Sequence, residues 1–486
     1  MSKTEVKTAQ AQYRFPKGFW WGSAASATQI EGAANEGGKG KNIWDHWYEI
    51  EPNRFFDGVG PEETSRFYET YKEDIQLMKE LGHHSFRFSI SWSRLFPEGK
   101  GELNPEGASF YSEGKGELNP EGASFYSDVI DELTAAGIEP FVNLYHFDMP
   151  MALQEIGGWE NREVVSHFVS YAETCFRLYG DRVKTWFTHN EPIVPVEGGY
   201  LYDFHYPNEI DFQKAVQVAY HEILSNAKAV EAYRKLGGDG KIGIILNVTP
   251  SYPRSRHPED VKASEIADAF FNRSFLDPAV KGEFPQLLAD IIKEEGFLPD
   301  MEPGDLELIK NNTVDLLGIN YYQPRRVKAK EHLPHPNAPF TPERFFDHYE
   351  MPGRKMNRHR GWEIYEKGIY DILMNLKNNY GNIECFISEN GMGVEGEERF
   401  RGEDGMIQDD YRIEFIKEHL KWVHKAIQEG SNVKGYHLWT FMDNWSWTNA
   451  YKNRYGFVSV NLDKNGERTV KKSGYWFKRV IDNNGF

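Results

Sequence analysis

The sequence has little cysteine, no long hydrophobic run and a deficit of basic residues. Its 486 residues include two cysteines, Cys175 and Cys385, both in apolar surroundings. Two such cysteines form no disulfide framework and are typical of a reduced, cytoplasmic protein. No uncharged apolar run approaches the roughly 20 residues of a membrane span. Residues 1–12 are polar and lack the apolar core of a secretory signal. We therefore expect a cytoplasmic protein without a membrane partner.

The charge balance is acidic, with 56 Lys and Arg against 74 Asp and Glu, a net charge of −18. This balance argues against nucleic acid or an anionic membrane as a partner. An anionic substrate would have to meet a local group of basic side chains. Aromatic residues make up 15% of the chain, which suits either stacking on ring-shaped ligands or ordinary core filling.

Predicted strands and helices alternate along the chain. Apolar runs predict eight strands, at residues 19–22, 85–90, 141–144, 185–188, 241–246, 314–319, 384–388 and 433–439. Helical periodicity follows each strand, at residues 61–81, 125–136, 164–178, 212–236, 262–275, 368–378, 412–427 and 472–481. Eight such units predict an α/β protein with a single (β/α)8 TIM barrel. No linker interrupts the series, so we expect a polar tail at 1–14 and one catalytic domain at 15–486.

One segment is duplicated. Residues 98–112 read EGKGELNPEGASFYS, and residues 113–127 repeat them letter for letter. One perfect copy is not a solenoid, which needs several stacked units. We expect Asn119 and Pro120 in the second copy to start the native helix as cap and first residue, and the first copy to bulge at the barrel rim. The alternative keeps the first copy in place and displaces the second.

Two carboxylates stand at the ends of predicted strands. Glu191 follows the fourth strand and precedes Pro192, and Glu389 follows the seventh strand and precedes an Asn-Gly pair. Either residue alone would be typical of a capped loop. The carboxyl ends of barrel strands share one face, where catalytic residues gather. Two carboxyl groups that face each other there would suit hydrolysis of a glycosidic bond.

These two motifs, Asn190-Glu191-Pro192 and Glu389-Asn390-Gly391, resemble those of glycoside hydrolase family 1, a β-glucosidase family of (β/α)8 barrels. The resemblance extends from about residue 15 to residue 477. It implies that Glu191 is the acid/base, that Glu389 is the nucleophile, and that the reaction retains the anomeric configuration. It also implies no cofactor and no metal; the histidines at 83, 84 and 335 suit no metal-ligand spacing.

Further residues match positions that bind the sugar in this family. Arg87 lies on the second strand and is expected to point at the same barrel mouth, where a guanidinium would keep Glu389 ionised or would form a structural ion pair. The resemblance implies that Tyr322 hydrogen-bonds the nucleophile, that Trp362 is a platform for the leaving group, and that Trp439 lies beneath the sugar. The remaining implied sugar contacts are Gln29, His146, Asn190 and Asn320.

The sharpest departure from ordinary family members follows the eighth strand. β-Glucosidases of the family carry Asn-Phe-Glu-Trp, whereas this chain has Ser446 in place of the glutamate, followed by Trp447. Loss of the carboxylate would permit a phosphate on the sugar's sixth position. The phospho-glycosidase branch uses a serine, a lysine and a tyrosine, which Ser446, Lys452 and Tyr455 resemble. The branch lysine lies two residues before the tyrosine, where this chain has Asn453.

The sequence therefore predicts a retaining 6-phospho-β-glucosidase. 6-Phospho-β-galactosides are left open because a tryptophan beside the serine, like Trp447 here, is also found in phospho-galactosidases. The expected partner is a small phosphorylated disaccharide or aryl glycoside, and a homo-oligomer is left open. Two alternatives stand beside this prediction. One is an unphosphorylated β-glucosidase, and the other is a non-hydrolytic sugar-binding protein on the same barrel.

Overall fold

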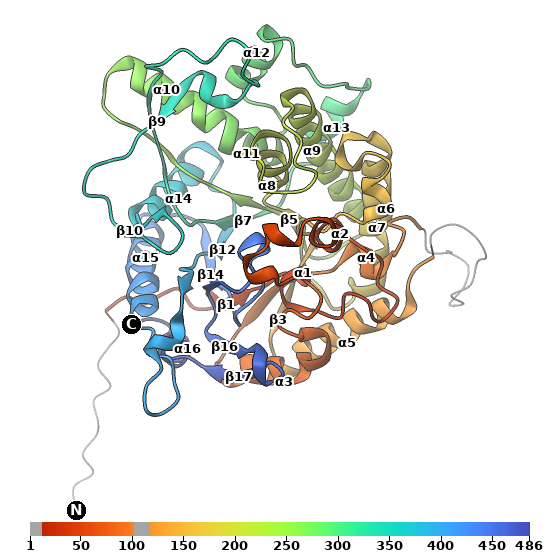
Figure 1. Cartoon of the computed structure of the whole chain (residues 1–486), viewed down its shortest axis with the longest axis vertical. Helices are drawn as coiled ribbons and strands as arrows, with labels where there is room; N and C mark the ends of the chain where they lie inside the picture. Colours follow the sequence, from red (N-terminus) through yellow and green to blue (C-terminus); the bar gives the residue numbers. More distant parts are fainter. Residues whose placement is uncertain (1–11, 102–116) are drawn as a thin grey trace, which may run out of the picture.

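Eight parallel strands close into a barrel (Figure 1). The computed structural model describes residues 12–101 and 117–486. The barrel order is β1-β14-β12-β7-β5-β4-β3-β2. The strands are β1 (Trp20–Ala24), β2 (Ser85–Ser89), β3 (Glu139–Tyr145), β4 (Thr185–Asn190), β5 (Lys241–Asn247), β7 (Leu316–Asn320), β12 (Cys385–Glu389) and β14 (Val433–Trp439). All eight predicted strands and the predicted TIM barrel are confirmed.

Helices surround the barrel. They include α3 (Phe67–Glu80), α5 (Pro120–Ala136), α7 (Arg162–Tyr179), α9 (Phe212–Lys235), α14 (Lys367–Asn379), α15 (Asp410–Gln428) and α16 (Lys472–Asn483). The helix predicted at 61–81 starts later than expected, because Arg66 has a left-handed backbone with φ of 60°. The helix predicted at 262–275 is divided into α10 (Pro258–Asp268), the π-helix η5 (Ala269–Arg273) and α11 (Ser274–Lys281).

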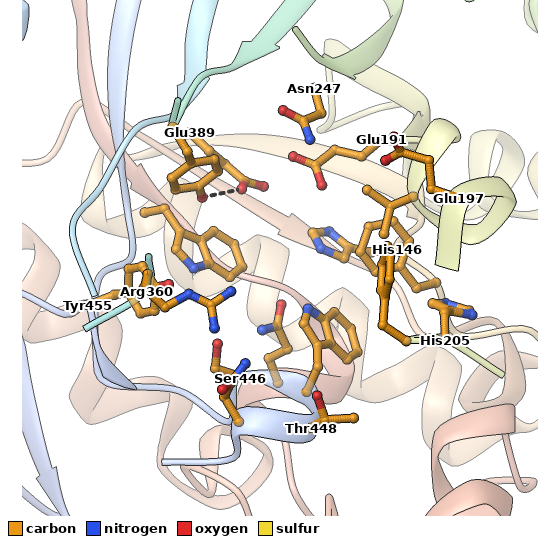
Figure 2. Close-up of a pocket in the computed structure, with 18 of the residues that line it drawn as sticks. His146, Glu191, Glu197, His205, Asn247, Arg360, Glu389, Ser446, Thr448 and Tyr455 are labelled. Atoms are coloured by element: carbon orange, nitrogen blue, oxygen red, sulfur yellow. Dashed lines mark hydrogen bonds between the residues drawn. The ribbon is translucent and has the colours of Figure 1, made fainter. Parts of the chain in front are cut away.

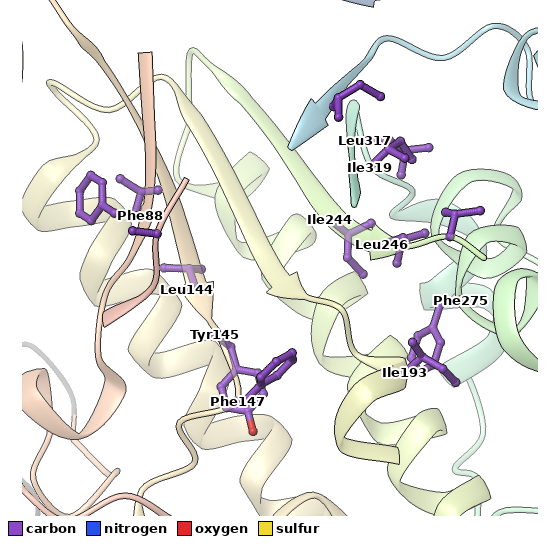
Figure 3. Packing of buried hydrophobic residues seen from close by; sticks show 14 of the residues in the cluster. Phe88, Leu144, Tyr145, Phe147, Ile193, Ile244, Leu246, Phe275, Leu317 and Ile319 are labelled. Carbon is purple, nitrogen blue, oxygen red and sulfur yellow. The ribbon is translucent and has the colours of Figure 1, made fainter. Parts of the chain in front are cut away.

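The strands bury both of their faces. Inside the barrel, one apolar cluster fills the space near the amino ends of the strands with Phe141, Phe187, Ile245, Leu316 and Phe386. Outside it, alternate residues such as Ile244 and Leu246 of β5 pack toward the helices with Ile319 of β7 (Figure 3). Because one end of the barrel is filled by side chains, a site for substrate is left at the carboxyl ends.

The second copy of the duplicated segment starts a barrel helix, as predicted. α5 begins at Pro120, and the side-chain oxygen of Asn119 accepts a hydrogen bond of 3.2 Å from the backbone N–H of Glu121. The Asn119 amide also donates to the carbonyls of Gly37 and Arg94, at 2.6 and 2.8 Å. The expected bulge of the first copy concerns residues 102–116, which lie outside the described residues.

Three further features concern membrane spans, the cysteines and the ends of the described chain. Within residues 12–101 and 117–486, no helix is long and apolar enough to cross a membrane. Cys175 and Cys385 are both buried and unpaired. At the start of the described chain, Tyr13 pairs with Phe486 through backbone hydrogen bonds, so the two ends of the described chain lie together.

Candidate active site

A cavity of about 370 Å³ opens at the carboxyl ends of the strands. This volume lies within the range typical of small-molecule sites. Most of the predicted site residues line it: Gln29, His146, Glu191, Tyr322, Trp362, Glu389, Trp439, Ser446, Trp447 and Tyr455. Figure 2 shows Glu191 and Glu389 projecting into it from two different strand ends. Arg87, Asn190 and Asn320 stand behind this lining and contact residues that form it.

Glu389 is the last residue of β12, and two side chains hold its carboxylate. The buried guanidinium of Arg87 forms an ion pair with Oε1. The phenol of Tyr322 donates a hydrogen bond of 2.7 Å to Oε2. Burial and the charge of Glu389 raise the pKa of Tyr322 well above its ordinary value, so this phenol stays protonated. Both contacts stabilise an ionised, oriented carboxylate.

Glu191 stands one residue beyond β4 with a positive φ of 47°. Such backbone is uncommon for a non-glycine residue and is concentrated at functional sites. Its N–H still donates to the carbonyl of Ile245, at 2.8 Å, and Asn320 donates to its Oε1, also at 2.8 Å. Burial, followed by the charge of Glu389, raises the pKa of Glu191 above its ordinary value. The raised pKa favours the protonated form of Glu191, which stands beside a carboxyl group held by Arg87 and Tyr322.

Neutral hydrogen-bonding groups surround the space between the two carboxyl groups. His146 is buried, and burial and Arg87 lower its pKa well below the ordinary value. Its Nε2 lies 3.3 Å from the amide nitrogen of Asn190. Gln29 is fixed by Ser26, which donates to its side-chain oxygen at 2.7 Å, and by its own donation to the carbonyl of Trp445 at 2.9 Å. These contacts hold the polar side chains of Gln29 and His146 in the lining of the cavity.

Aromatic rings form the walls of the cavity. The ring of Trp439 stacks on His146 with centroids 5.9 Å apart, and Trp447 lies 6.0 Å from the same histidine. Trp362 packs at 5.3 Å from Tyr322 on another wall. Apolar faces of this kind suit the carbon–hydrogen faces of a sugar ring.

One end of the cavity carries a serine, a tyrosine and a cation: Ser446, Tyr455 and Arg360, which we call the Arg360 cluster (Figure 2). Arg360 lies with its guanidinium carbon 4.3 Å from the ring centre of Trp362. Its Nε is buried without a hydrogen-bond partner, and no ion pair to Arg360 occurs in the described part of the chain. Burial raises the pKa of Tyr455, which keeps its phenol available as a donor. The three side chains together suit an anion.

Lys452, which the sequence placed beside Ser446 and Tyr455, does not line this cavity. It lines a separate cavity of about 300 Å³ with Glu397, Glu398 and Asp443. The reason is strand alternation: β15 (Asn453–Arg454) pairs with β13 (Val394–Glu395), so neighbouring side chains point to opposite sides. Tyr455 faces the active-site cavity while Lys452 and Arg454 face the other. A shift of one residue along the strand moves a side chain to the opposite face.

Comparison with known proteins agrees with this geometry. The sequence profile of glycosyl hydrolase family 1 matches residues 11–113 and 112–486. The chain belongs to glycosyl hydrolase family 1. The match is divided inside the duplicated segment, where residues 113–127 repeat residues 98–112.

Relatives within family 1 include phosphorylated-sugar enzymes and plain β-glucosidases. The 6-phospho-beta-glucosidase GmuD of Bacillus subtilis is 75% identical over 98% of this chain and 99% of its own. The 6-phospho-beta-galactosidase of Clostridium acetobutylicum is 37% identical over 96% of each chain. A family 1 β-glucosidase structure from Thermotoga maritima superposes with a TM-score of 0.87 at 36% identity, over 98% of this chain and 99% of that one.

In this family 1 chain, Asn453 has a contact that bears on Arg360. Its side-chain amide donates a hydrogen bond of 3.3 Å to the carbonyl of His359, the residue before Arg360. The same turn, between β10 (Met356–Asn357) and β11 (Trp362–Glu363), is tied to the loop after β12 by Asn357, which donates to the carbonyl of Gly393 at 3.0 Å. Asn453 stands where the phospho-glycosidase branch has its lysine. It therefore supports the turn that carries another cation, Arg360.

A buried ion network holds the loops that follow β12 and β14. Arg412 pairs with Glu397 and Asp409, and it donates to the carbonyl of Arg454 at 3.3 Å. Lys471 bridges Glu397 and Asp443, and the Asp443 carboxylate accepts from the backbone N–H of Gly456 at 2.9 Å. Because Arg454 and Gly456 flank Tyr455, this network fixes the backbone on both sides of Tyr455.

Several residues of the cavity have no recognisable signal in the sequence. Arg360 was detectable only as a basic residue two positions before the expected platform Trp362. Glu197 and Asn247 flank Glu191 in Figure 2, and no motif marks either of them. Among the described residues, the one group able to offer three ligand atoms to a metal is Glu331, His332 and Asp347. None of these three lines the active-site cavity.

Proposed function

We propose that this family 1 chain is a retaining 6-phospho-β-glucosidase that acts on phosphorylated β-glucosides in the cytoplasm, with residues 15–486 as one catalytic domain. The observation that carries the proposal is the Arg360 cluster, an unpaired guanidinium beside a serine and a tyrosine where ordinary members carry a carboxylate. The 75% identical relative named a 6-phospho-beta-glucosidase supports the same substrate class.

In the first step, the Glu389 carboxylate attacks the anomeric carbon. A bond forms between a Glu389 oxygen and that carbon, the bond to the leaving-group oxygen breaks, and the proton of Glu191 passes to the departing oxygen. Arg87 and Tyr322 keep Glu389 ionised and oriented before the attack. The raised pKa of Glu191 keeps its proton available near neutral pH.

In the second step, Glu191 serves as the base. The ester to Glu389 removes the negative charge that helps to raise the pKa of Glu191, so that pKa falls. Glu191 can then take a proton from water while the water oxygen attacks the anomeric carbon and the ester bond breaks. The free Glu389 carboxylate returns to its contacts with Arg87 and Tyr322. The two steps together retain the configuration of the anomeric carbon.

The phosphate lies against the Arg360 cluster in this proposal. The guanidinium supplies charge and fork-shaped donors, while the hydroxyls of Ser446 and Tyr455 supply further donors. The Arg360 cluster contains no carboxylate that would repel the phosphate. In contrast, Lys452 faces a cavity lined by Glu397, Glu398 and Asp443 and takes no part.

Binding of the products tests the proposal directly. Isothermal titration calorimetry of the whole chain with glucose 6-phosphate, galactose 6-phosphate and glucose compares the three sugars at this site. We expect glucose 6-phosphate, or else galactose 6-phosphate, to bind at least about 100-fold more tightly than glucose. The reason is that two or more charge-assisted hydrogen bonds would hold the phosphate. Equal binding of glucose and both phosphates would overturn the proposal in favour of an unphosphorylated β-glucosidase.

A further inference from the structure

A second cavity lies outside the barrel, among helices that take no part in the mechanism. Its volume is about 880 Å³, against about 370 Å³ for the active-site cavity. Its lining comes from α9, η5, α11 and two further helices, α12 (Gln286–Glu294) and α13 (Asp305–Asn311), which Figure 1 shows on one side of the barrel. The volume lies within the range typical of small-molecule sites.

The walls of this second cavity are apolar and rich in aromatic rings. Its buried lining, none of it more than 7% exposed, includes Phe212, Phe270, Phe271, Phe275 and Leu288. Three further apolar residues of the lining are 51%, 46% and 51% exposed: Leu298, Met301 and Leu306. They form an apolar rim where the cavity opens to solvent. Half-exposed apolar side chains that gather in this way are typical of a ligand-binding surface.

Polar groups of this lining are already paired or face solvent. The Ser274 hydroxyl donates a hydrogen bond of 2.7 Å to the carbonyl of Phe270. Glu283 and Lys310 form an ion pair of 3.3 Å, and both side chains are more than half exposed. In the described part of the chain, no buried side-chain polar atom of the lining lacks a hydrogen-bond partner. The interior therefore offers an occupant no unpaired side-chain donor or acceptor.

The polarity of the second cavity determines which occupant it suits. A peptide segment would bring backbone N–H and C=O groups that need partners, and the interior supplies none from its side chains. A second copy of the chain would have to bury the exposed charged side chains of Glu283, Glu307 and Lys310 at the rim, and it would leave the interior empty. A neutral small molecule with ring faces fills the interior and packs on the phenylalanine rings.

The second cavity shares a wall with the active site. The helix α8 (Ile193–Val196) begins two residues after Glu191 and continues into the π-helical turn η4 (Glu197–Leu201). Side chains of this wall face both ways. The active-site cavity is lined by Val194 and Glu197, and the second cavity is lined by Ile193, Val196 and Leu201. The two cavities have no lining residue in common.

An occupant of the second cavity would contact the segment that follows the catalytic acid. Ile193 and Phe275 of α11 line this cavity together (Figure 3). Glu191 has a φ of 47°, a conformation that persists only where the surrounding structure holds it. Additional packing on Ile193 and Val196 would add dispersion contacts to α8 directly after Glu191. Occupancy should therefore stabilise this wall.

We propose that the second cavity binds a neutral, ring-containing apolar small molecule, and that its occupancy stabilises α8 and η4. The rings pack between the phenylalanines of α9, η5 and α11, while Ile193 and Val196 cover one side. A polar substituent of the molecule faces solvent beside Glu283 and Lys310. Because the two cavities are lined by different residues, the molecule does not compete with the sugar.

Binding is tested with N-phenyl-naphthylamine, a neutral dye built of aromatic rings whose fluorescence rises in apolar surroundings. The whole chain is titrated with the dye beside Ala219→Trp and Ala289→Trp, which add a large ring to the cavity from α9 and from α12. Ala135→Trp is the matched control, because Ala135 is an exposed residue of α5 outside this cavity. Two filling variants are used so that the other one decides if one of them fails to fold.

We expect the dye to bind the unaltered chain and Ala135→Trp with the same Kd. It should bind either filling variant at least about 10-fold more weakly, since the added ring occupies the space that the dye needs. Absence of binding to the unaltered chain, or equal binding by all four proteins, would overturn the site.

Amide hydrogen exchange tests the connection to α8 and η4. With the dye at about 10 times its Kd, openings of residues 193–201 that empty the cavity should become about 10-fold rarer, and exchange there should slow by the same factor. The dye should not change these rates in Ala289→Trp. Unchanged exchange at residues 193–201 in the dye-bound, unaltered chain would overturn the stabilisation of this wall. Neither measurement involves a phosphorylated sugar, so the outcome is independent of the proposed function.

Discussion

The phenol of Tyr322 donates a hydrogen bond of 2.7 Å to Oε2 of Glu389. Arg87 occupies the other oxygen, so the carboxylate enters the reaction with both oxygens held. Tyr322→Phe removes one charge-assisted bond and leaves the ring in place. We expect kcat to fall roughly 10- to 100-fold with a small change in KM, as loss of one hydrogen bond to a charge implies. A rate unchanged by the substitution would show that Tyr322 does not orient the nucleophile.

The two carboxyl groups should respond differently to an added nucleophile. Glu389→Ala leaves room for azide on the side of the nucleophile, and the product should be a glycosyl azide of inverted configuration. Glu191→Ala should slow hydrolysis by roughly 10²- to 10⁴-fold, and azide should then give a product of retained configuration. NMR of the glycosyl azides distinguishes the two outcomes. Absence of rescue for Glu389→Ala, or a retained product from it, would contradict the assignment of roles.

The charge of Glu389 should control the titration of Glu191. Burial is the larger cause of the raised pKa, and the Glu389 charge adds to it. The acid must be protonated, so a raised pKa extends activity to higher pH, and activity falls as the pH rises through it. In Glu389→Gln the carboxyl of Glu191 should titrate at a lower pH than in the unaltered chain. Titration followed by ¹³C NMR of labelled glutamate checks this, and an unchanged pKa would refute electrostatic coupling of the pair.

Arg360 and Lys452 form a matched pair of cations for testing the phosphate site. Arg360→Met should lower kcat/KM for the 6-phosphorylated glucoside by about 100-fold, while the plain glucoside should change little. Lys452→Met should leave both values nearly unchanged because Lys452 lines a different cavity. Asn453→Ala, which removes the bond to the His359 carbonyl, should give a smaller loss of the same kind. A larger effect of Lys452→Met than of Arg360→Met would reverse the assignment.

The duplicated segment contains a matched control residue for the N-cap of α5. Asn119 caps α5 and also bonds the carbonyls of Gly37 and Arg94, whereas Asn104 is its counterpart in the first copy. Asn119→Ala should lower the free energy of unfolding by about 1 kcal/mol or more. Asn104→Ala should have no measurable effect in the same thermal unfolding experiment. Equal destabilisation by the two substitutions would mean that the first copy also contributes a helix start.

Much of the barrel could be predicted because its signals are local. Apolar runs of four to seven residues marked all eight strands, and the position of Glu191 and Glu389 at strand ends placed both in one cavity. The start of α3 could not be predicted, because the left-handed backbone of Arg66 has no signal in side-chain periodicity.

The phosphate end was harder to predict because it is assembled from distant segments. Proximity in sequence suggested Lys452, but strand alternation turns that side chain away from Tyr455. Arg360 lies in a turn more than 80 residues before Ser446 in the sequence. Its turn is held by Asn357 and Asn453, contacts that no local pattern reveals.

Discrimination between a phosphorylated and a plain glucoside can be measured on one pair of substrates. kcat/KM is measured with the unaltered chain for p-nitrophenyl β-glucoside and for the same compound phosphorylated at the sixth position. We predict that the phosphorylated compound is preferred at least about 100-fold, as the donors of Arg360, Ser446 and Tyr455 imply. Equal values, or preference for the plain glucoside, would contradict the account and would identify the chain as an ordinary β-glucosidase.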